Sequence, residues 1–145
     1  MRLYDLRTEY RVNPIGLTAK TPRFSWKIES QEKDTLQTAY EIHVTDEKGK
    51  LVWNSGKRAS DQSVLIPYEG EALASETLYT VQVSVADNHG NTESVEGTFE
   101  TGIFDNTEFK AQMITSDFPE KETACPVFGK TFALDKKVKK ACLYA

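Results

Sequence analysis

The side chains best suited to chemistry in this chain are its carboxylates, which could serve as a general acid and a general base. Such a pair must converge on one cleft, where the surroundings set each pKa. Here the acidic residues are scattered over outward strand faces and turns, as at Glu41, Asp46, Asp87 and Glu93. Because ionised carboxylates are rarely buried, we interpret them as solvated surface groups and predict no catalytic residue.

Other reactive side chains give weaker signals. His43 lies on an outward face and His89 in a turn, and neither has a cluster of further metal ligands nearby in the sequence. The lysine-rich run at residues 136–140 could bind an anion, but lysines at a strand edge more simply prevent edge-to-edge pairing. There is no glycine-rich phosphate loop and no nucleophile motif. We therefore predict neither a metal nor a cofactor.

Three aromatic residues, Tyr40, Trp53 and Tyr68, could form a platform on which a sugar ring stacks. Tyr40 shares strand parity with Ile42, which favours a place in the core. For Trp53, packing beneath the turn that follows it is favoured over an exposed role. Trp53 and Tyr68 are kept as candidate contacts for a sugar or a protein partner.

The composition limits the class of protein. The chain has 145 residues with 18 Lys and Arg against 22 Asp and Glu, giving a formal charge of −4. This length predicts one domain, or one domain and a fragment. A chain of this length can bury a hydrophobic core without disulfides or metal ions to stabilise it. A mildly acidic balance argues against general nucleic-acid binding, which needs a basic footprint.

Cysteine content and hydropathy narrow the class further. Cys125 and Cys142 are too few for a disulfide scaffold, and their spacing matches no common zinc site. No apolar run approaches the ~20 residues of a membrane span. The start of the chain lacks the apolar centre of a secretory signal, so we expect a cytoplasmic protein if Met1 is the natural start.

The elements that must position these residues are strands, and the clearest one begins at Tyr79. There Tyr79, Val81 and Val83 alternate with polar residues, the pattern of a half-buried strand. Leu73 precedes the tyrosine in the layout of a tyrosine corner, in which the phenol reaches back to the backbone of the preceding loop. We expect all three strand residues to lie in the core.

Similar alternation predicts six further strands, at residues 6–12, 23–30, 39–46, 51–53, 63–68 and 94–101. Trp26 is the expected central aromatic residue. Turn signals recur about every eight to twelve residues, and no segment shows a helical apolar period. The sequence therefore predicts an all-β, antiparallel sandwich of the fibronectin type III or immunoglobulin-like class over residues 1–102. The lack of a cysteine pair between the sheets favours the fibronectin-like variant.

After Gly102 the pattern changes. We interpret residues 103–145 as a linker and the truncated start of a second β-sandwich, because the chain stops within an apolar run. Four apolar side chains of this tail are expected to pack on the sandwich or to pair with a second copy of the chain: Phe128, Phe132, Leu134 and Leu143.

Six short patches follow one another in order: Asn-Pro-Ile-Gly-Leu at 13–17, Pro-Arg-Phe-Ser-Trp at 22–26, Gln-Thr-Ala-Tyr-Glu-Ile at 37–42, Leu-Val-Trp-Asn-Ser-Gly-Lys at 51–57, Ser-Asp-Gln-Ser at 60–63 and Phe-Glu-Thr-Gly at 99–102. Their order and spacing resemble the N-terminal fibronectin-like module of bacterial α-L-rhamnosidases. Residues 126–132 and 138–144 resemble the start of the next β-sandwich in that family, although the arginines usual near Gly129 and Cys142 are missing.

The resemblance implies a role without chemistry of its own. In that family a carboxylate pair in a helical (α/α)₆ barrel, far downstream, hydrolyses terminal α-L-rhamnosides with inversion. The expected function here is a non-catalytic accessory module whose partners are neighbouring modules of the same polypeptide, or a second copy through the tail. Two alternatives stay open: a carbohydrate-binding module, and a free-standing protein-interaction domain.

Overall fold

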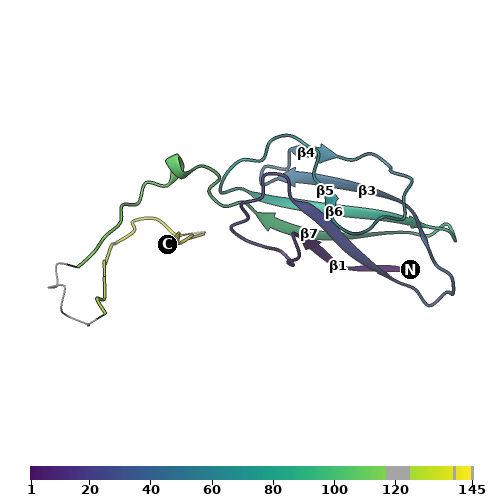
Figure 1. Cartoon of the computed structure of the whole chain (residues 1–145), viewed down its shortest axis with the longest axis horizontal. Helices are drawn as coiled ribbons and strands as arrows, with labels where there is room; N and C mark the ends of the chain where they lie inside the picture. Colours follow the sequence, from purple (N-terminus) through teal and green to yellow (C-terminus); the bar gives the residue numbers. More distant parts are fainter. Residues whose placement is uncertain (117–124, 139, 145) are drawn as a thin grey trace. The chain divides into compact units, whose positions relative to one another are not determined.

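The computed structural model describes residues 1–116, 125–138 and 140–144, and it divides into two compact units, Met1–Lys110 and Ala111–Ala145. The first unit is an antiparallel β-sandwich, as predicted (Figure 1). One sheet has the order β1-β2-β5 and the other β4-β3-β6-β7. The strands are β1 (Arg2–Thr8), β2 (Arg23–Glu29), β3 (Gln37–Asp46), β4 (Leu51–Asn54), β5 (Ile66–Pro67), β6 (Leu78–Asp87) and β7 (Thr92–Glu100).

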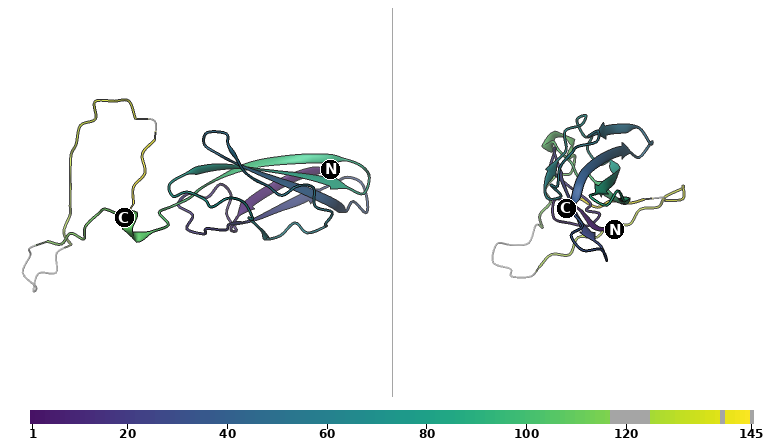
Figure 2. Two further views of the ribbon diagram at one scale, coloured as in Figure 1. Left: turned by 90° about the horizontal axis from the view of Figure 1, so that it is seen from above. Right: turned by 90° about the vertical axis from the view of Figure 1, so that its right-hand side faces the viewer.

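The two longest strands, β3 and β6, form the spine of the larger sheet. Ile42 lies opposite Val83 and Val44 opposite Val81, and all four side chains are fully or almost fully buried. Their alternation with polar residues therefore follows the pleat of the strands, with one face in the core and the other in water. Figure 2 shows the two layers from above and from one end.

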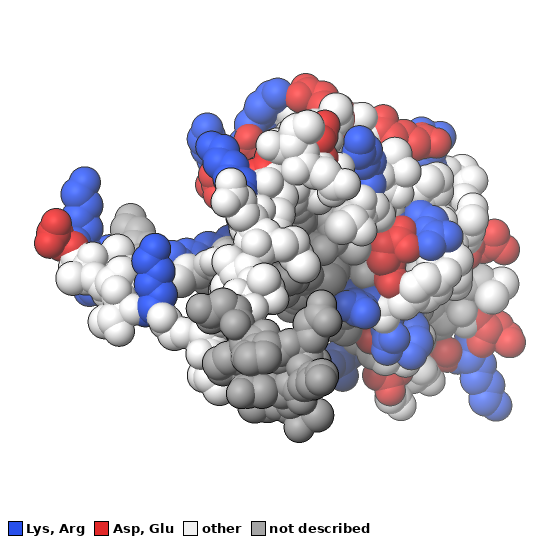
Figure 3. Space-filling model, turned by 60° about the vertical axis from the view of Figure 1, so that its left-hand side comes forward, with Lys and Arg blue, Asp and Glu red and all other residues white. Residues whose placement is uncertain are grey.

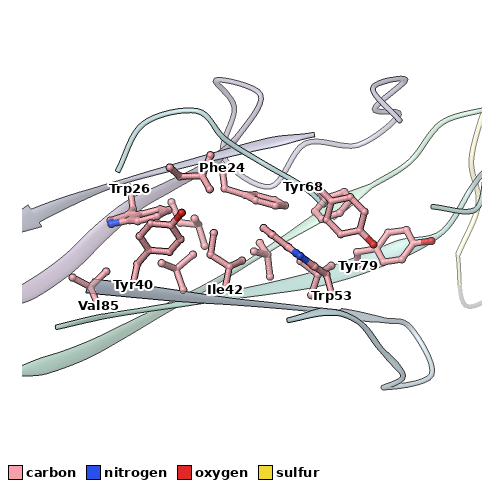
Figure 4. Close-up of a cluster of buried hydrophobic side chains, with 14 of the residues drawn as sticks. Phe24, Trp26, Tyr40, Ile42, Trp53, Tyr68, Tyr79 and Val85 are labelled. Atoms are coloured by element: carbon pink, nitrogen blue, oxygen red, sulfur yellow. The ribbon is translucent and has the colours of Figure 1, made fainter. Parts of the chain in front are cut away.

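The core contains the five residues expected there: Trp26, Tyr40, Tyr79, Val81 and Val83 are all buried. Figure 4 labels the three aromatic residues among them. Trp26 packs edge-on against Tyr40 at 5.4 Å between ring centroids. Its indole N–H donates to Oε1 of Gln37 at 2.9 Å, which satisfies the one polar atom that the ring brings into the core.

The first strand lies four residues earlier than the sequence predicts, because the chain is irregular at two places. The prediction of a strand at 6–12 is wrong: β1 ends at Thr8. A register shift after Tyr4, with Asp5 at φ 51°, turns both Leu3 and Leu6 inward. A bulge of this kind changes the side-chain parity, so that Leu3 and Leu6 both face the core although they are three residues apart, and a period-two pattern misses the start of the strand. The strand ends after Thr8, which is buried, because the chain turns back at Glu9 and Tyr10.

Strand β5 is also shorter than the predicted strand at 63–68. Leu65 adopts φ 54°, and its amide donates to Oγ of Ser25 instead of to a strand ladder. Pro67 lacks an amide proton and ends the pairing with β2. The segment before Ile66 is therefore a loop that is bonded to β2 at single points.

Past β7, the described residues contain a short 3₁₀ helix, η1 (Asn106–Glu108), and no further strand. Of the four tail side chains expected to find cover, Phe128 is 54% exposed, and Phe132, Leu134 and Leu143 are more exposed still. The structure thus shows no cover for them, and pairing with a second copy stays a prediction. The first unit extends to Lys110, beyond the boundary expected at Gly102.

Candidate functional site at the chain exit

Two of the four carboxylates singled out in the sequence, Asp46 and Asp87, hold turns. Oδ1 of Asp46 accepts from the amides of Lys48 and Lys50, each at 2.9 Å. Asp87 does the same for the turn between β6 and β7, where it accepts from the amides of His89 and Asn91. Burial raises the pKa of Asp87, but the hydrogen bonds from Asn91 and His89 outweigh it and the net pKa is lowered.

The remaining reactive groups are just as dispersed. Glu41 pairs with His43 on the outer sheet face at 3.0 Å, and Glu93 is exposed. In the described part of the chain, no group of three or more His, Cys, Asp or Glu residues could hold a metal ion. On the face seen in Figure 3, acidic and basic side chains are interspersed and neither sign forms a large patch.

The proposed aromatic platform is corrected by the structure. Trp53 is only 8% exposed and Tyr68 3%, and their rings meet edge to face at 5.2 Å between centroids. The hydroxyl of Tyr68 donates to the carbonyl of Glu71 at 2.8 Å, and burial raises the pKa of Tyr68 to about 12. Both rings belong to the core because β4 turns Trp53 inward, so neither has a free face for a sugar.

A crevice of about 240 Å³ does open beside Trp53, between Tyr40 and the side chains of Arg58 and Glu69. Arg58 and Glu69 form an ion pair across it at 3.2 Å. Tyr40 is as deeply buried as Trp53. Since stacking requires an accessible ring face, the crevice lacks the surface that a pyranose would contact.

A set of polar contacts joins three segments of the chain where it leaves the sandwich. The phenol oxygen of Tyr79 accepts from the amide of Ala74 at 2.8 Å, which is the contact that a tyrosine corner predicts. The hydroxyl of Thr101 donates to the carbonyl of Ala74 at 2.7 Å. The Oγ1 atom of Thr101 also accepts a hydrogen bond from the amide of Thr77 at 2.9 Å. Thr101 is fully buried. The loop before β6 is thus tied to both β6 and the end of β7.

The loop between β1 and β2 contacts the other side of the segment in which β7 ends and the chain leaves the sandwich. The amide of Glu100 donates to the carbonyl of Pro14 at 2.8 Å, and the amide of Leu17 donates to the carbonyl of Glu100 at 2.9 Å. The amide of Gly102 then donates to the carbonyl of Leu17 at 2.8 Å. A Cβ at Gly102 would lie 3.1 Å from the carbonyl oxygen of Gly16, so the close approach favours glycine.

The contacts continue into the segment after the last strand. The amide of Phe104 donates to Oγ of Ser75 at 3.1 Å, and the amide of Glu76 donates to the carbonyl of Gly102 at 3.2 Å. Asp105 then caps η1: its carboxylate accepts from the amide of Thr107 at 2.8 Å, and this contact is the main reason why the pKa of Asp105 is lowered. We name these three segments, residues 13–17, 73–77 and 100–105, the exit clamp.

The contacts of the exit clamp hold the backbone from Glu100 to Asp105 on two sides. Two of the patches noted in the sequence, at 13–17 and 99–102, meet here. Sequence reasoning used them as marks of resemblance and missed that they form one site, since no periodicity links segments so far apart.

Comparison with known proteins shows which family this sandwich resembles. The family model described as "Rha78A-like, N-terminal immunoglobulin domain" matches residues 3–105. An alpha-L-rhamnosidase of Streptomyces avermitilis is 35% identical over 128 residues, which are 84% of this chain and 12% of that protein. An alpha-L-rhamnosidase of Alteromonas is 32% identical over 149 residues, covering 92% of this chain and 16% of that protein.

Solved structures agree with the sequence relatives. The alpha-L-rhamnosidase of Streptomyces avermitilis, complexed with L-rhamnose, aligns with a TM-score of 0.71 at 35% identity over 76% of this chain and 11% of that one. The alpha-L-rhamnosidase of Aspergillus terreus aligns with a TM-score of 0.72 at 26% identity over 84% and 14%. The chain thus spans about an eighth of the length of the first relatives it matches.

Proposed function

This chain belongs to the family of Rha78A-like N-terminal immunoglobulin domains, and from that premise we propose that it is a non-catalytic accessory module of an α-L-rhamnosidase-type glycoside hydrolase. The module holds the next part of the polypeptide in a set direction and itself catalyses nothing. The parent protein would hydrolyse terminal α-L-rhamnosides with inversion, by carboxylates outside this chain. The partners of the module are neighbouring modules of the same polypeptide.

The exit clamp is the observation that carries this proposal. A domain boundary normally falls in a flexible linker with few contacts. Here the first residues after β7 are bonded both to the loop before β6 and to the loop after β1. Such bonding limits the directions in which the following segment can leave, as expected of a module that orients its neighbours.

The distribution of the carboxylates supports the non-catalytic part. Inverting glycoside hydrolysis needs two carboxyl groups roughly 6.5–9.5 Å apart across a substrate cleft, one of them with a raised pKa. Among the described residues, the acids with a resolved pKa shift are Asp5, Glu9, Asp87 and Asp105, and hydrogen bonds or ion pairs lower the pKa of each. A lowered pKa keeps a carboxyl ionised, which is the opposite of what a general acid requires.

A second copy of the chain is a further candidate partner, and the tail would provide the contact. Phe128, Phe132 and Leu134 are exposed, and exposed apolar β-type segments are prone to pair with another chain. We propose that two copies of residues 1–145 associate through them. Sedimentation of residues 1–145 beside residues 1–110 tests this: a dimer only for the longer chain is expected, and a monomer for both would refute it.

Heat stability of the longer polypeptide tests the supporting role. We expect that removing residues 1–110 from a parent enzyme lowers the melting temperature of the remainder by several degrees, because a docked neighbour stabilises what it contacts. An unchanged melting temperature would contradict the proposal. Titration of this chain with rhamnose-containing oligosaccharides distinguishes the carbohydrate-binding alternative, and no saturable heat is expected.

None of the helices among the described residues is long and apolar enough to cross a membrane. The cytoplasmic location stays a prediction.

A further inference from the structure

The loop between β1 and β2 begins with an unusual turn. The amide of Thr8 donates to the carbonyl of Arg11 at 2.9 Å, and the amide of Arg11 donates back at 3.1 Å, which closes a two-residue turn. The two residues at its tip, Glu9 and Tyr10, have φ values of 51° and 77°. Positive φ at both positions is the geometry that usually selects Asn and Gly. Bulky residues in this region persist only where their surroundings hold them, and such places gather at functional sites.

Arg23 is what holds this turn. Its Nε donates to Oε1 of Glu9 at 2.9 Å and its Nη2 to Oε2 at 2.6 Å, while its own amide donates to Oε1 at 2.9 Å. The guanidinium also lies over the ring of Tyr10, 5.6 Å from the centroid. A planar fork fixed on a carboxylate in this way gives a defined geometry. The turn therefore holds Tyr10 in one position at the surface.

The side chains presented by this loop are apolar. Tyr10 is 63% exposed, Val12 58% and Ile15 78%. Beside them the segment from Glu9 to Ala19 encloses a hollow of about 390 Å³. Arg11 is exposed and has no ion-pair partner among the described residues. We call Tyr10, Arg11, Val12 and Ile15 with this hollow the Tyr10 surface.

The Tyr10 surface lies next to the exit of the chain. Pro14, within the same loop, accepts the amide hydrogen of Glu100, and Leu17 is bonded to both Glu100 and Gly102. In Figure 1 this loop and the end of β7 lie at the same end of the sandwich. The segment that leaves the sandwich after Gly102 therefore begins beside the loop that carries these exposed apolar side chains.

We propose that the Tyr10 surface is a docking site for a folded downstream domain of the same polypeptide, beyond residue 145. The proposal rests on the accessory role proposed above and adds where the contact is made. Aromatic residues and arginine are enriched at the centres of protein interfaces, and a rigid aromatic side chain loses little entropy on binding. The docked domain presents an apolar face to Tyr10 and Ile15, with a carboxylate opposite Arg11.

A second copy of the chain fits this surface less well. In a two-fold dimer the same patch meets itself, so Arg11 would face the surface that carries its own symmetry mate. The nearest carboxylate in the loop, Glu9, is already occupied by Arg23. The unpaired charge therefore favours a different, acidic partner.

The experiment compares hydroxyl-radical labelling of residues 1–145 with that of a longer polypeptide containing the downstream domains. The probes are Tyr10 and Ile15. Leu36 is the matched control: it is 66% exposed and lies at the opposite end of the sandwich, where its amide bonds to Asn88 after β6. We expect labelling of Tyr10 and Ile15 to fall roughly fivefold or more in the longer polypeptide, as for a buried interface centre, and that of Leu36 to stay unchanged.

Three variants of the longer polypeptide complete the test. Ile15→Ser and Arg11→Glu should restore the labelling of Tyr10, whereas Leu36→Ser should not. All three change exposed side chains, so residues 1–145 carrying them should keep the labelling pattern of the unmodified chain elsewhere.

The possible outcomes separate the two proposals. Protection of Tyr10 that Arg11→Glu relieves supports the docking site. Protection elsewhere on the sandwich, with Tyr10 still fully labelled, overturns the docking site and leaves the accessory role standing. Labelling that is identical in the two proteins at every position overturns both.

Discussion

Replacing Tyr79 by phenylalanine removes one hydroxyl group and leaves the ring that packs in the core. The ring is 3% exposed and stacks on Phe99 at 5.2 Å between centroids, so Tyr79→Phe creates no cavity. What is lost is the acceptor of the amide of Ala74 at 2.8 Å. A buried donor left without a partner costs about 1–3 kcal/mol. Because Ala74 itself is exposed, the lower half of this range applies, and we expect a loss of about 1.5 kcal/mol.

Urea unfolding followed by the fluorescence of Trp26 and Trp53, both in the core, measures this loss. With an m value of roughly 1.5 kcal/mol/M, the midpoint should fall by roughly 1 M while m stays constant. Tyr4→Phe is the control, because Tyr4 is 37% exposed and its hydroxyl forms no hydrogen bond to any described residue. A loss below about 0.5 kcal/mol for Tyr79→Phe, within the range of ordinary surface substitutions, would refute the reasoning.

A double-mutant cycle extends the test to the whole exit clamp. Thr101→Val keeps the shape but removes the hydroxyl that donates to the carbonyl of Ala74 and accepts from Thr77. We expect Thr101→Val alone to lower the free energy of unfolding by about 2 kcal/mol. The double variant with Tyr79→Phe should lose less than the sum of the two single losses, because both side chains hold the same loop. Thr101→Ser, which retains the hydroxyl, should recover most of the stability. Strict additivity would mean that the loop is not held as one unit.

Three further predictions concern packing and pH. Gly70→Ala places a Cβ 2.5 Å from Cβ of Trp53, and calorimetry should show a loss of about 1–3 kcal/mol; an unchanged transition would contradict the packing. Glu9 has a pKa held below its ordinary 4.5 by Arg23, so its stabilising effect is present above pH 4.5 and is lost as pH falls through the folded-state pKa. The stability gap between wild type and Glu9→Gln should therefore narrow in acid, and a constant gap would be inconsistent with the ion pair. The pKa of Tyr68 is raised from 10.0 to about 12, so stability should decline as pH rises from 10.0 to about 12, and less so in Tyr68→Phe.

The sequence predicts the spine of the sandwich well, because β6, and β3 from Tyr40 onward, follow the period of two. Ile42 and Val83 lie on the buried face for the same reason that they alternate with polar residues. The beginning of the first strand is missed because the bulge at Asp5 breaks the period of two between Leu3 and Leu6. The turn at Glu9 and Tyr10 lacks the glycine or asparagine that would have marked it.

The candidate site was only partly predictable. Tyr79 was found in the sequence, since the spacing from Leu73 to a tyrosine at a strand start is a local signal. The remaining exit clamp depends on backbone contacts, such as that of Pro14 with Glu100, which any residue type can make. Trp53 was assigned a candidate surface role because a short edge strand gives too few residues to fix which side faces inward.

The central claim, that this module supports chemistry carried out elsewhere, is tested most directly by the release of the chromogenic group from an aryl α-L-rhamnoside. The assay compares purified residues 1–145 with a longer polypeptide that includes the downstream domains. The account predicts release by the longer polypeptide and none above the buffer rate by residues 1–145. Release by residues 1–145 that scales with protein concentration would contradict it.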